Sequence, residues 1–178
     1  MAKASDRDGE DDADRHVARW RDHWIDVDFD DEVEGAVVRM QHLVRHFREA
    51  KQRAVAQVGL QAFEYDTLHT LMIRDTPGHA SPTDLATDLG VSPAGMTGRL
   101  DTLEKAGYVG RTVGKTDRRR VEVEITDAGA DIWRQAMAIR GDAEDQVVNV
   151  LSKKEQIALN QLLKRMTLSV EAEGEQDH

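Results

Sequence analysis

The hydrophobic residues of this chain recur at helical spacing over most of its length. The longest such stretch covers residues 32–57, and a second runs from 61 to 74. A shorter stretch begins at Ala13, and two long ones follow Thr126. Because these stretches account for most of the residues, the pattern predicts a mainly α-helical protein.

Two short helices in the middle of the chain carry matching start signals. In SPTDLATDLG, Ser81 can cap a helix whose first residue is Pro82, and Gly90 ends it. In SPAGMTGRLDTLEKAG, Ser92 and Pro93 repeat the arrangement. Two short helices joined by a tight turn that contains glycine predict a helix-turn-helix.

After the second of these helices, the hydrophobic period changes to two. Val121, Val123 and Ile125 alternate with glutamates, which predicts a β-strand, and the preceding run YVGRTV predicts another. The segment GKTDRR between them supplies the tip of a hairpin. A helix-turn-helix followed by such a hairpin is the winged-helix arrangement. The predicted fold class is therefore mainly α with a small β-hairpin wing: a winged helix-turn-helix core flanked by long N- and C-terminal dimerisation helices.

The long flanking helices have apolar faces larger than one small domain can cover. We therefore predict a homodimer that is built from both ends of the chain. The predicted organisation is a disordered acidic tail (1–12), two N-terminal helices (13–60), a winged helix-turn-helix DNA-binding domain (61–126), C-terminal dimerisation helices (127–170) and a second acidic tail (171–178).

The charge distribution adds a functional indication to this fold. The chain has a formal net charge of −10, yet residues 91–120 hold seven Lys and Arg against three Asp and Glu. Arg118, Arg119 and Arg120 stand together at the predicted wing tip. A positive patch on a negative body is what a polyanion-binding surface requires, since binding depends on the charges near the phosphates. Charge alone leaves a solvated basic loop open as the alternative.

A winged helix of this kind has two surfaces suited to double-stranded DNA. The second helix of the pair can enter a major groove, and the hairpin tip can reach the neighbouring minor groove. Small and hydroxylic residues at the helix start allow close approach to phosphates, and arginines suit the negative potential of a narrow minor groove. In a two-fold dimer, operator half-sites are expected roughly 10 bp apart. The predicted DNA-binding residues are Ser81, Ser92, Ala94, Gly95, Thr97, Gly98, Asp101, Lys115, Asp117, Arg118, Arg119 and Arg120.

The composition excludes several other classes of function. The absence of cysteine rules out disulfides, thiolate metal sites and thiol-based redox sensing. The sequence contains no nucleophile elbow or glycine-rich phosphate loop, so we predict neither an enzyme nor a bound cofactor. No apolar run is long enough to cross a bilayer and the N-terminus has no hydrophobic signal region, so we expect no membrane association and a cytoplasmic location.

Two other interpretations of the same fold stay open. His42 and His46 lie four residues apart on one predicted helix and could share a metal ion with His69, which would make the chain a zinc-responsive regulator. Outside an HExxH frame, however, such histidines are more often interfacial or partly exposed. The second alternative is a winged helix that is used only for protein contacts.

The stretch LATDLGVSPAGMTGRLDTLEKAGYVGRTVGKTDRRRVEVEITDAG resembles the MarR (multiple antibiotic resistance regulator) family. The helix-turn-helix, LEKAGYV, the DRR wing and ITDAG fall in the family's order, and the resemblance covers residues 32–170. It implies a dimeric, ligand-responsive transcription regulator, most often a repressor that leaves a palindromic operator. The family's Asp-x-Arg wing pattern falls on Asp117 and Arg119, which implies that Arg119 enters the minor groove. Asp117 can orient Arg119 by a charge-assisted hydrogen bond or simply make the turn.

A narrower resemblance is to the urate-responsive (UrtR) branch of that family, which has an added N-terminal helix. It implies a ligand pocket of Trp20, Asp66, Arg99 and Arg111, and a small anionic effector such as urate, a purine or a polycarboxylate. Two guanidinium groups bind an anion, a tryptophan stacks on a ring, and a carboxylate accepts a ring N–H. Each residue also has an ordinary alternative: helix packing for Trp20, an ion pair for Asp66 with Arg99, and a phosphate contact for Arg111.

Overall fold

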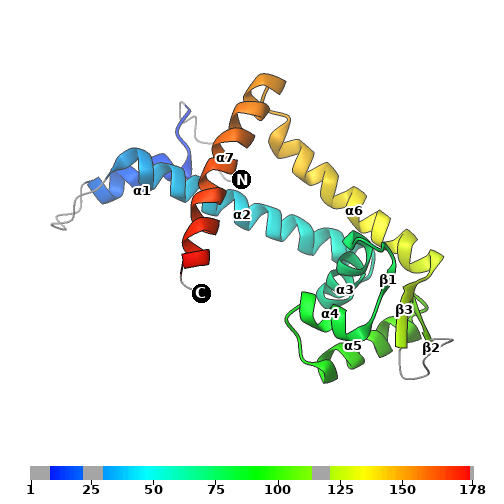
Figure 1. The fold of residues 1–178 in the computed structure, drawn as a ribbon. Helices are drawn as coiled ribbons and strands as arrows, with labels where there is room; N and C mark the ends of the chain where they lie inside the picture. The colour runs from blue at the N-terminus through cyan, green and yellow to red at the C-terminus, as the bar shows by residue number, and fades with distance from the viewer. Residues whose placement is uncertain (1–8, 22–29, 114–120, 177–178) are drawn as a thin grey trace. The chain divides into compact units, whose positions relative to one another are not determined.

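The computed structural model describes residues 9–21, 30–113 and 121–176, and most of them are helical (Figure 1). The chain divides into two compact units, residues 1–49 and 50–178, and the division falls inside one long helix. The sequence analysis instead placed the boundary between the N-terminal helices and the DNA-binding domain after residue 60. In chain order the elements are α1 (Asp12–Arg21), α2 (Asp31–Gln57), α3 (Ala62–Ile73), β1 (His79–Ala80), α4 (Pro82–Asp88), α5 (Pro93–Lys105), β2 (Val109–Val113), β3 (Val121–Ile125), α6 (Asp127–Val148) and α7 (Lys153–Gln176).

In the first unit, α1 is joined to the first half of α2 mainly by ion pairs. The guanidinium of Arg39 on α2 donates to Asp11 at 2.8 Å and to Asp14 at 2.6 Å. Hydrogen bonds from Arg39 lower the pKa of Asp11 to about 2. α1 begins at Asp12, so the helix includes the last residue that was assigned to the acidic tail (1–12). Residues 1–8 lie outside the described part of the chain.

The apolar contribution of α1 is small. Only Ala13 and Val17 of this helix are buried, whereas Trp20 is 39% exposed, with its ring 5.9 Å from that of His16. His16 in turn lies 2.9 Å from the carboxylate of Glu34. Ala13 and Val17 therefore supply the buried side chains of α1, and the role of Trp20 stays a prediction.

The second unit is organised around a single apolar core. Figure 1 shows α3, α4 and α5 grouped beside the strands, with α6 leading away from them. Fully buried leucines from three helices meet the inward-facing valine of β3 in this core. The largest fully buried side chains are Tyr65, Thr67, Leu68, Leu71, Leu85, Met96, Leu100, Leu103 and Val123. The core thus fixes the helix-turn-helix to the sheet.

Local signals set the bounds of the helix pair. The Ser81 hydroxyl accepts the N–H of Asp84, and the Ser92 hydroxyl accepts the N–H of Gly95, both at 3.1 Å. Each helix begins with the predicted proline, and Gly90 follows the first at φ +61°. The predicted caps of α4 and α5 are confirmed.

The sheet has one more strand than the sequence predicts. The strand order is β1–β3–β2, all antiparallel, with Ala80 opposite Val123 and Arg111 opposite Val123 on the other side. A two-residue strand has no period that a sequence can show, and HA follows a Pro-Gly turn. The predicted mainly α fold with a small wing is confirmed, and the wing is attached through β1 to the end of α3.

The junction between the sheet and α6 leaves no room for a side chain. Thr126 caps α6 by accepting the N–H of Gly129 at 3.0 Å, and its hydroxyl donates to the carbonyl of Gly107 at 2.7 Å. A Cβ at Gly129 would overlap the carbonyl oxygen of Tyr108. The motif ITDAG therefore holds the start of α6 against the segment that links α5 to β2.

The last helix, α7, carries an exposed apolar face. Leu159, Leu163, Met166 and Val170 recur at spacings of four, three and four residues, which places them on one side of α7, and all are exposed. The helix continues to Gln176, so residues 171–176 of the predicted acidic tail belong to it. No helix among the described residues is both long enough and apolar enough to cross a bilayer.

Candidate nucleic-acid interface

The outer face of α5 consists of small and polar residues, as the sequence predicts. Met96, Leu100 and Leu103 are buried on the inner face, and a side chain added at Gly98 would meet nothing within 4 Å. The exposed residues include all six that were predicted on this helix: Ser92, Ala94, Gly95, Thr97, Gly98 and Asp101. This face can therefore approach a large partner closely.

The first turn of α5 has less free hydrogen-bonding capacity than a generic helix start. Pro93 has no N–H, and the N–H of Gly95 is taken by the Ser92 hydroxyl. The Thr97 hydroxyl donates to the carbonyl of Pro93 at 3.0 Å. Binding of an anion by this turn would thus fall to the amide of Ala94 and to the hydroxyl hydrogen of Ser92.

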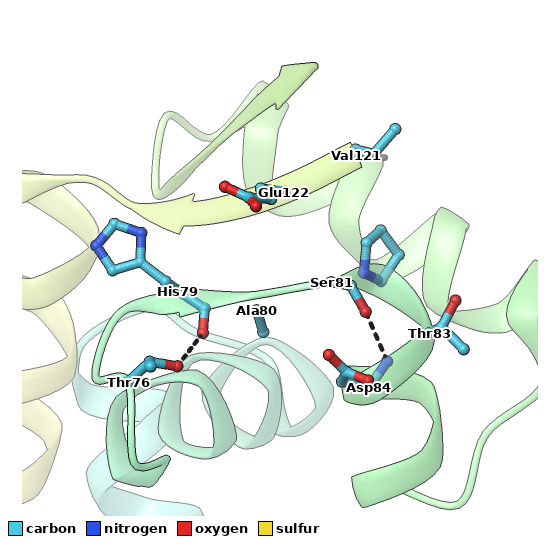
Figure 2. A pocket seen from close by; sticks show the side chains of 9 residues that line it. Thr76, His79, Ala80, Ser81, Thr83, Asp84, Val121 and Glu122 are labelled. Atoms are coloured by element: carbon cyan, nitrogen blue, oxygen red, sulfur yellow. Dashed lines mark hydrogen bonds between the residues drawn. The ribbon is translucent and has the colours of Figure 1, made fainter. Parts of the chain in front are cut away.

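Ser81 lies in a groove of about 780 Å³ between the start of α4 and the strands β1 and β3 (Figure 2). Thr76 and His79 line one end, and the Thr76 hydroxyl donates to the carbonyl of His79 at 3.1 Å. The carboxylates of Asp84 and Glu122 also line the groove. These two acids disfavour a phosphate group in the groove. The structure therefore shows Ser81 only as the cap of α4, and its contact with DNA stays a prediction.

The predicted wing-tip residues fall outside the described part of the chain. These are Lys115, Asp117, Arg118, Arg119 and Arg120, and the described strands end at Val113 and resume at Val121. Their predicted contacts with DNA therefore stay predictions.

The side chain of Arg111 extends from β2 to α5. Its Nη2 donates to the carboxylate of Asp101 at 2.7 Å and lies 3.4 Å from the carbonyl oxygen of Thr97. Its Nε lies 3.7 Å from the carboxylate of Glu104 and is buried without a hydrogen-bond partner. Arg111, which was predicted for ligand binding, is thus engaged with α5.

The other predicted ligand residues have separate partners. Asp66 accepts from Lys51 at 2.6 Å, and the described contacts include no ion pair between Asp66 and Arg99. Arg99 stands over the ring of Phe63, at 5.8 Å from its centroid. Within the described residues, no hydrogen bond or ion pair joins Asp66, Arg99 and Arg111. Trp20 belongs to the first unit and the other three belong to the second.

A cluster that the sequence analysis missed lies beside Asp66, between α3 and α6. The ring of His69 stacks on Tyr65 at 5.5 Å, and the Trp133 indole N–H donates to His69 Nδ1 at 3.2 Å. Arg140 reaches the Tyr65 hydroxyl at 3.4 Å. The available signal was spacing: positions 65 and 69 share one face of α3, and positions 133 and 140 share one face of α6.

The histidines of the zinc alternative have different surroundings. His42 is exposed on α2, and the ring nitrogen of His69 accepts from Trp133. No group of three or more His, Cys, Asp or Glu side chains is placed to hold a metal ion within residues 9–21, 30–113 and 121–176.

The comparisons with known proteins agree with this arrangement. A model of the MarR family matches residues 64–121. The chain is 30% identical over 151 residues to the HTH-type transcriptional regulator PecS of Dickeya dadantii (strain 3937), which covers 84% of this chain and 89% of PecS. The chain belongs to the MarR family. It is also 26% identical over 125 residues to the transcriptional repressor MprA of Escherichia coli (strain K12), which covers 70% of each chain.

Solved structures of similar proteins share the fold. The YusO protein from Bacillus subtilis superimposes with a TM-score of 0.67 at 18% identity, over 79% of this chain and 99% of YusO. The S. aureus MepR–DNA complex gives a TM-score of 0.59 at 21% identity, over 73% of this chain and 96% of MepR. The winged-helix fold is confirmed. PecS and MprA are a transcriptional regulator and a transcriptional repressor, so the relatives of this chain are regulators and not enzymes.

We expect the His69 cluster to make stability depend on pH. Burial and the nearby charges of Arg140 and Lys51 lower the pKa of His69 below its ordinary value of 6.5, while Asp66 opposes this. The unfolded chain then binds the proton more readily than the folded chain. The stabilising contribution is complete above pH 6.5 and is lost as the pH falls through the lowered pKa.

This prediction is checked by thermal unfolding at a series of pH values. His69→Gln, which cannot titrate, should flatten the loss of stability below pH 6.5. His42→Gln, which removes an exposed histidine of α2, serves as the control and should keep the wild-type profile. Identical pH profiles for wild type and His69→Gln would contradict the assignment.

Proposed function

We propose that the chain is a homodimeric, sequence-specific DNA-binding transcription regulator that represses genes and leaves a palindromic operator when a small anionic ligand binds. The observation that carries the proposal is the outer face of α5. This face is exposed and small, it begins at a capped helix start, and it lies beside β2, which leads to the basic segment 115–120. The DNA complex of MepR and the regulators PecS and MprA support it.

In this proposal α5 enters the major groove and the wing reaches the minor groove. The exposed residues Thr97 and Asp101 face the base edges, while Gly95 and Gly98 let the helix backbone approach the phosphates. Arg119 inserts into the minor groove and Asp117 orients it. Outside this edge the acidic surface repels DNA, which favours one docking orientation.

DNA binding by the intact protein should weaken steeply as salt rises, because each neutralised phosphate releases counterions. Arg119→Ala should lower the affinity and reduce the slope of log K against log salt by about one. The measurement is fluorescence anisotropy with a duplex selected from a random pool. Arg134→Ala is the matched control, since Arg134 lies on α6 and pairs with Asp131. If no duplex binds at low salt, the chain is a protein-interaction module instead.

The dimer is proposed from the apolar face of α7 and from the family. Four large side chains on one side of this helix stay exposed in a single chain. Full burial of such a side chain is worth about 1.5–3 kcal/mol, and these partly exposed side chains contribute a fraction of that each when an assembly covers them. A second copy of the chain supplies the same face, and a two-fold dimer presents two copies of α5 to successive turns of DNA.

Leu163→Glu should convert the dimer to a monomer, because a carboxylate on the apolar face of α7 has no partner there. Gln161→Glu is the matched control: it introduces the same residue on the opposite side of α7 and should leave the dimer intact. Light scattering after size-exclusion chromatography measures the mass. A Leu163→Glu variant that remains dimeric would place the interface elsewhere.

The effector part of the proposal rests on the resemblance to the urate-responsive branch. Its pocket would use Trp20, Asp66, Arg99 and Arg111, of which two are cations and one is an aromatic ring. Arg99 belongs to α5, so a ligand that pulls on it would shift the recognition helix. Operator affinity would then fall by the difference in ligand affinity between the two states of the protein.

Urate, xanthine or citrate at millimolar concentration should reduce operator affinity by about 5- to 150-fold. Trp20→Ala should lose this response while binding the operator normally without ligand, because Trp20 lies in the first unit, outside the helix-turn-helix. The same anisotropy titration, repeated with each compound, provides the measurement. If none of the three compounds alters binding, the anionic effector is refuted while the DNA-binding proposal stands.

A further inference from the structure

The outer face of α5 carries two carboxylates, although it is the face proposed to meet the phosphate backbone. The side chain of Asp101 is 61% exposed and that of Glu104 is 45% exposed. Left alone, two negative charges at this position would repel DNA, and they would do so in a region where DNA also excludes water. Their charge must be offset by a neighbouring cation if this helix binds DNA tightly.

Arg111 is placed to offset both carboxylates. It stands on β2, and its side chain is only 24% exposed, since it lies along the surface of α5. Its Nη2 approaches Asp101 and the carbonyl of Thr97, and its Nε approaches Glu104. A planar fork can serve acceptors one turn apart on a helix, whereas an ammonium group acts as a point charge.

We propose that Arg111 is a positioning residue for DNA binding, which fixes the outer face of α5 to the wing strand β2 and neutralises Asp101 and Glu104. The inference rests on the proposed DNA-binding function. It differs from a phosphate contact, because the partners of Arg111 are acids of the protein itself. It also connects the two elements proposed to bind DNA, so that the distance between α5 and the wing stays fixed.

This role predicts a rescue that a phosphate contact does not. If Arg111 only touched DNA, its loss would cost the same affinity whatever residue stood at position 101. If Arg111 neutralises Asp101, its loss exposes an unpaired carboxylate, and removing that carboxylate restores binding. The two effects are then strongly non-additive, as expected for residues in direct contact.

The test is a double-mutant cycle on the intact protein, with an operator duplex and a scrambled duplex as probes. Arg111→Gln should weaken binding to both duplexes by about 10- to 100-fold, and Asp101→Asn in that background should recover at least about tenfold on the scrambled duplex. Arg111→Lys restores charge without the fork, so it should recover scrambled-duplex binding but not the preference for the operator. Thermal unfolding of each variant identifies any that fail to fold.

A second pair, Arg111→Gln with Glu104→Gln, repeats the cycle at the other carboxylate and keeps the test open if Asp101 itself reads a base. Additive losses in both cycles, with folded variants, would overturn the positioning role and leave Arg111 as a direct DNA contact. Absence of DNA binding by the wild-type protein would instead overturn the proposed function. The two failures are therefore distinguishable.

Discussion

The burial of the inner face of α5 is the constraint on which the rest of the second unit depends. Met96, Leu100 and Leu103 are at most 1% exposed, and they pack among the buried residues of α3, α4 and the sheet. A helix held in this way cannot rotate about its axis without opening cavities in the core. Its outer face therefore stays turned to solvent, and residues there are released from packing and available for recognition.

Local chemistry made the helix-turn-helix predictable from the sequence. Features that depend on pairing between distant residues could not be predicted in the same way. The caps at Ser81 and Ser92 depend on residues within one turn, so the sequence contains the whole signal. β1 forms because Ala80 pairs with Val123, more than forty positions later in the chain. A strand of two residues also has no hydrophobic period that a sequence could show. The pairing of Asp66 with Lys51, and of Arg111 with Asp101, likewise depends on how the elements pack.

The candidate site likewise has a part that local sequence predicts and a part that depends on distant pairing. The exposed face of α5 follows from helical periodicity, because once Met96 and Leu100 are inside, the intervening positions must lie outside. Family resemblance placed Arg111 in a ligand pocket, and its charge placed it in the basic region of the chain. Neither indicated which side chain it pairs with. Only the antiparallel register, which sets Arg111 opposite Val123 in the sheet, brings this side chain to the surface of α5. The charge of the exposed α5 face is thus decided by pairing as much as by composition.

The contacts of Arg111 also connect its two proposed roles. The guanidinium already holds Asp101 at 2.7 Å, so an anionic effector at Arg111 would have to compete with a carboxylate of the recognition helix. An anion that won this competition would release Asp101 and Glu104 as uncompensated charges on the face proposed to meet DNA. Such a ligand would lower DNA affinity by electrostatic repulsion even without a large movement of α5. Ligand response and DNA binding would then share one cation, which is the simplest way in which two sites become coupled.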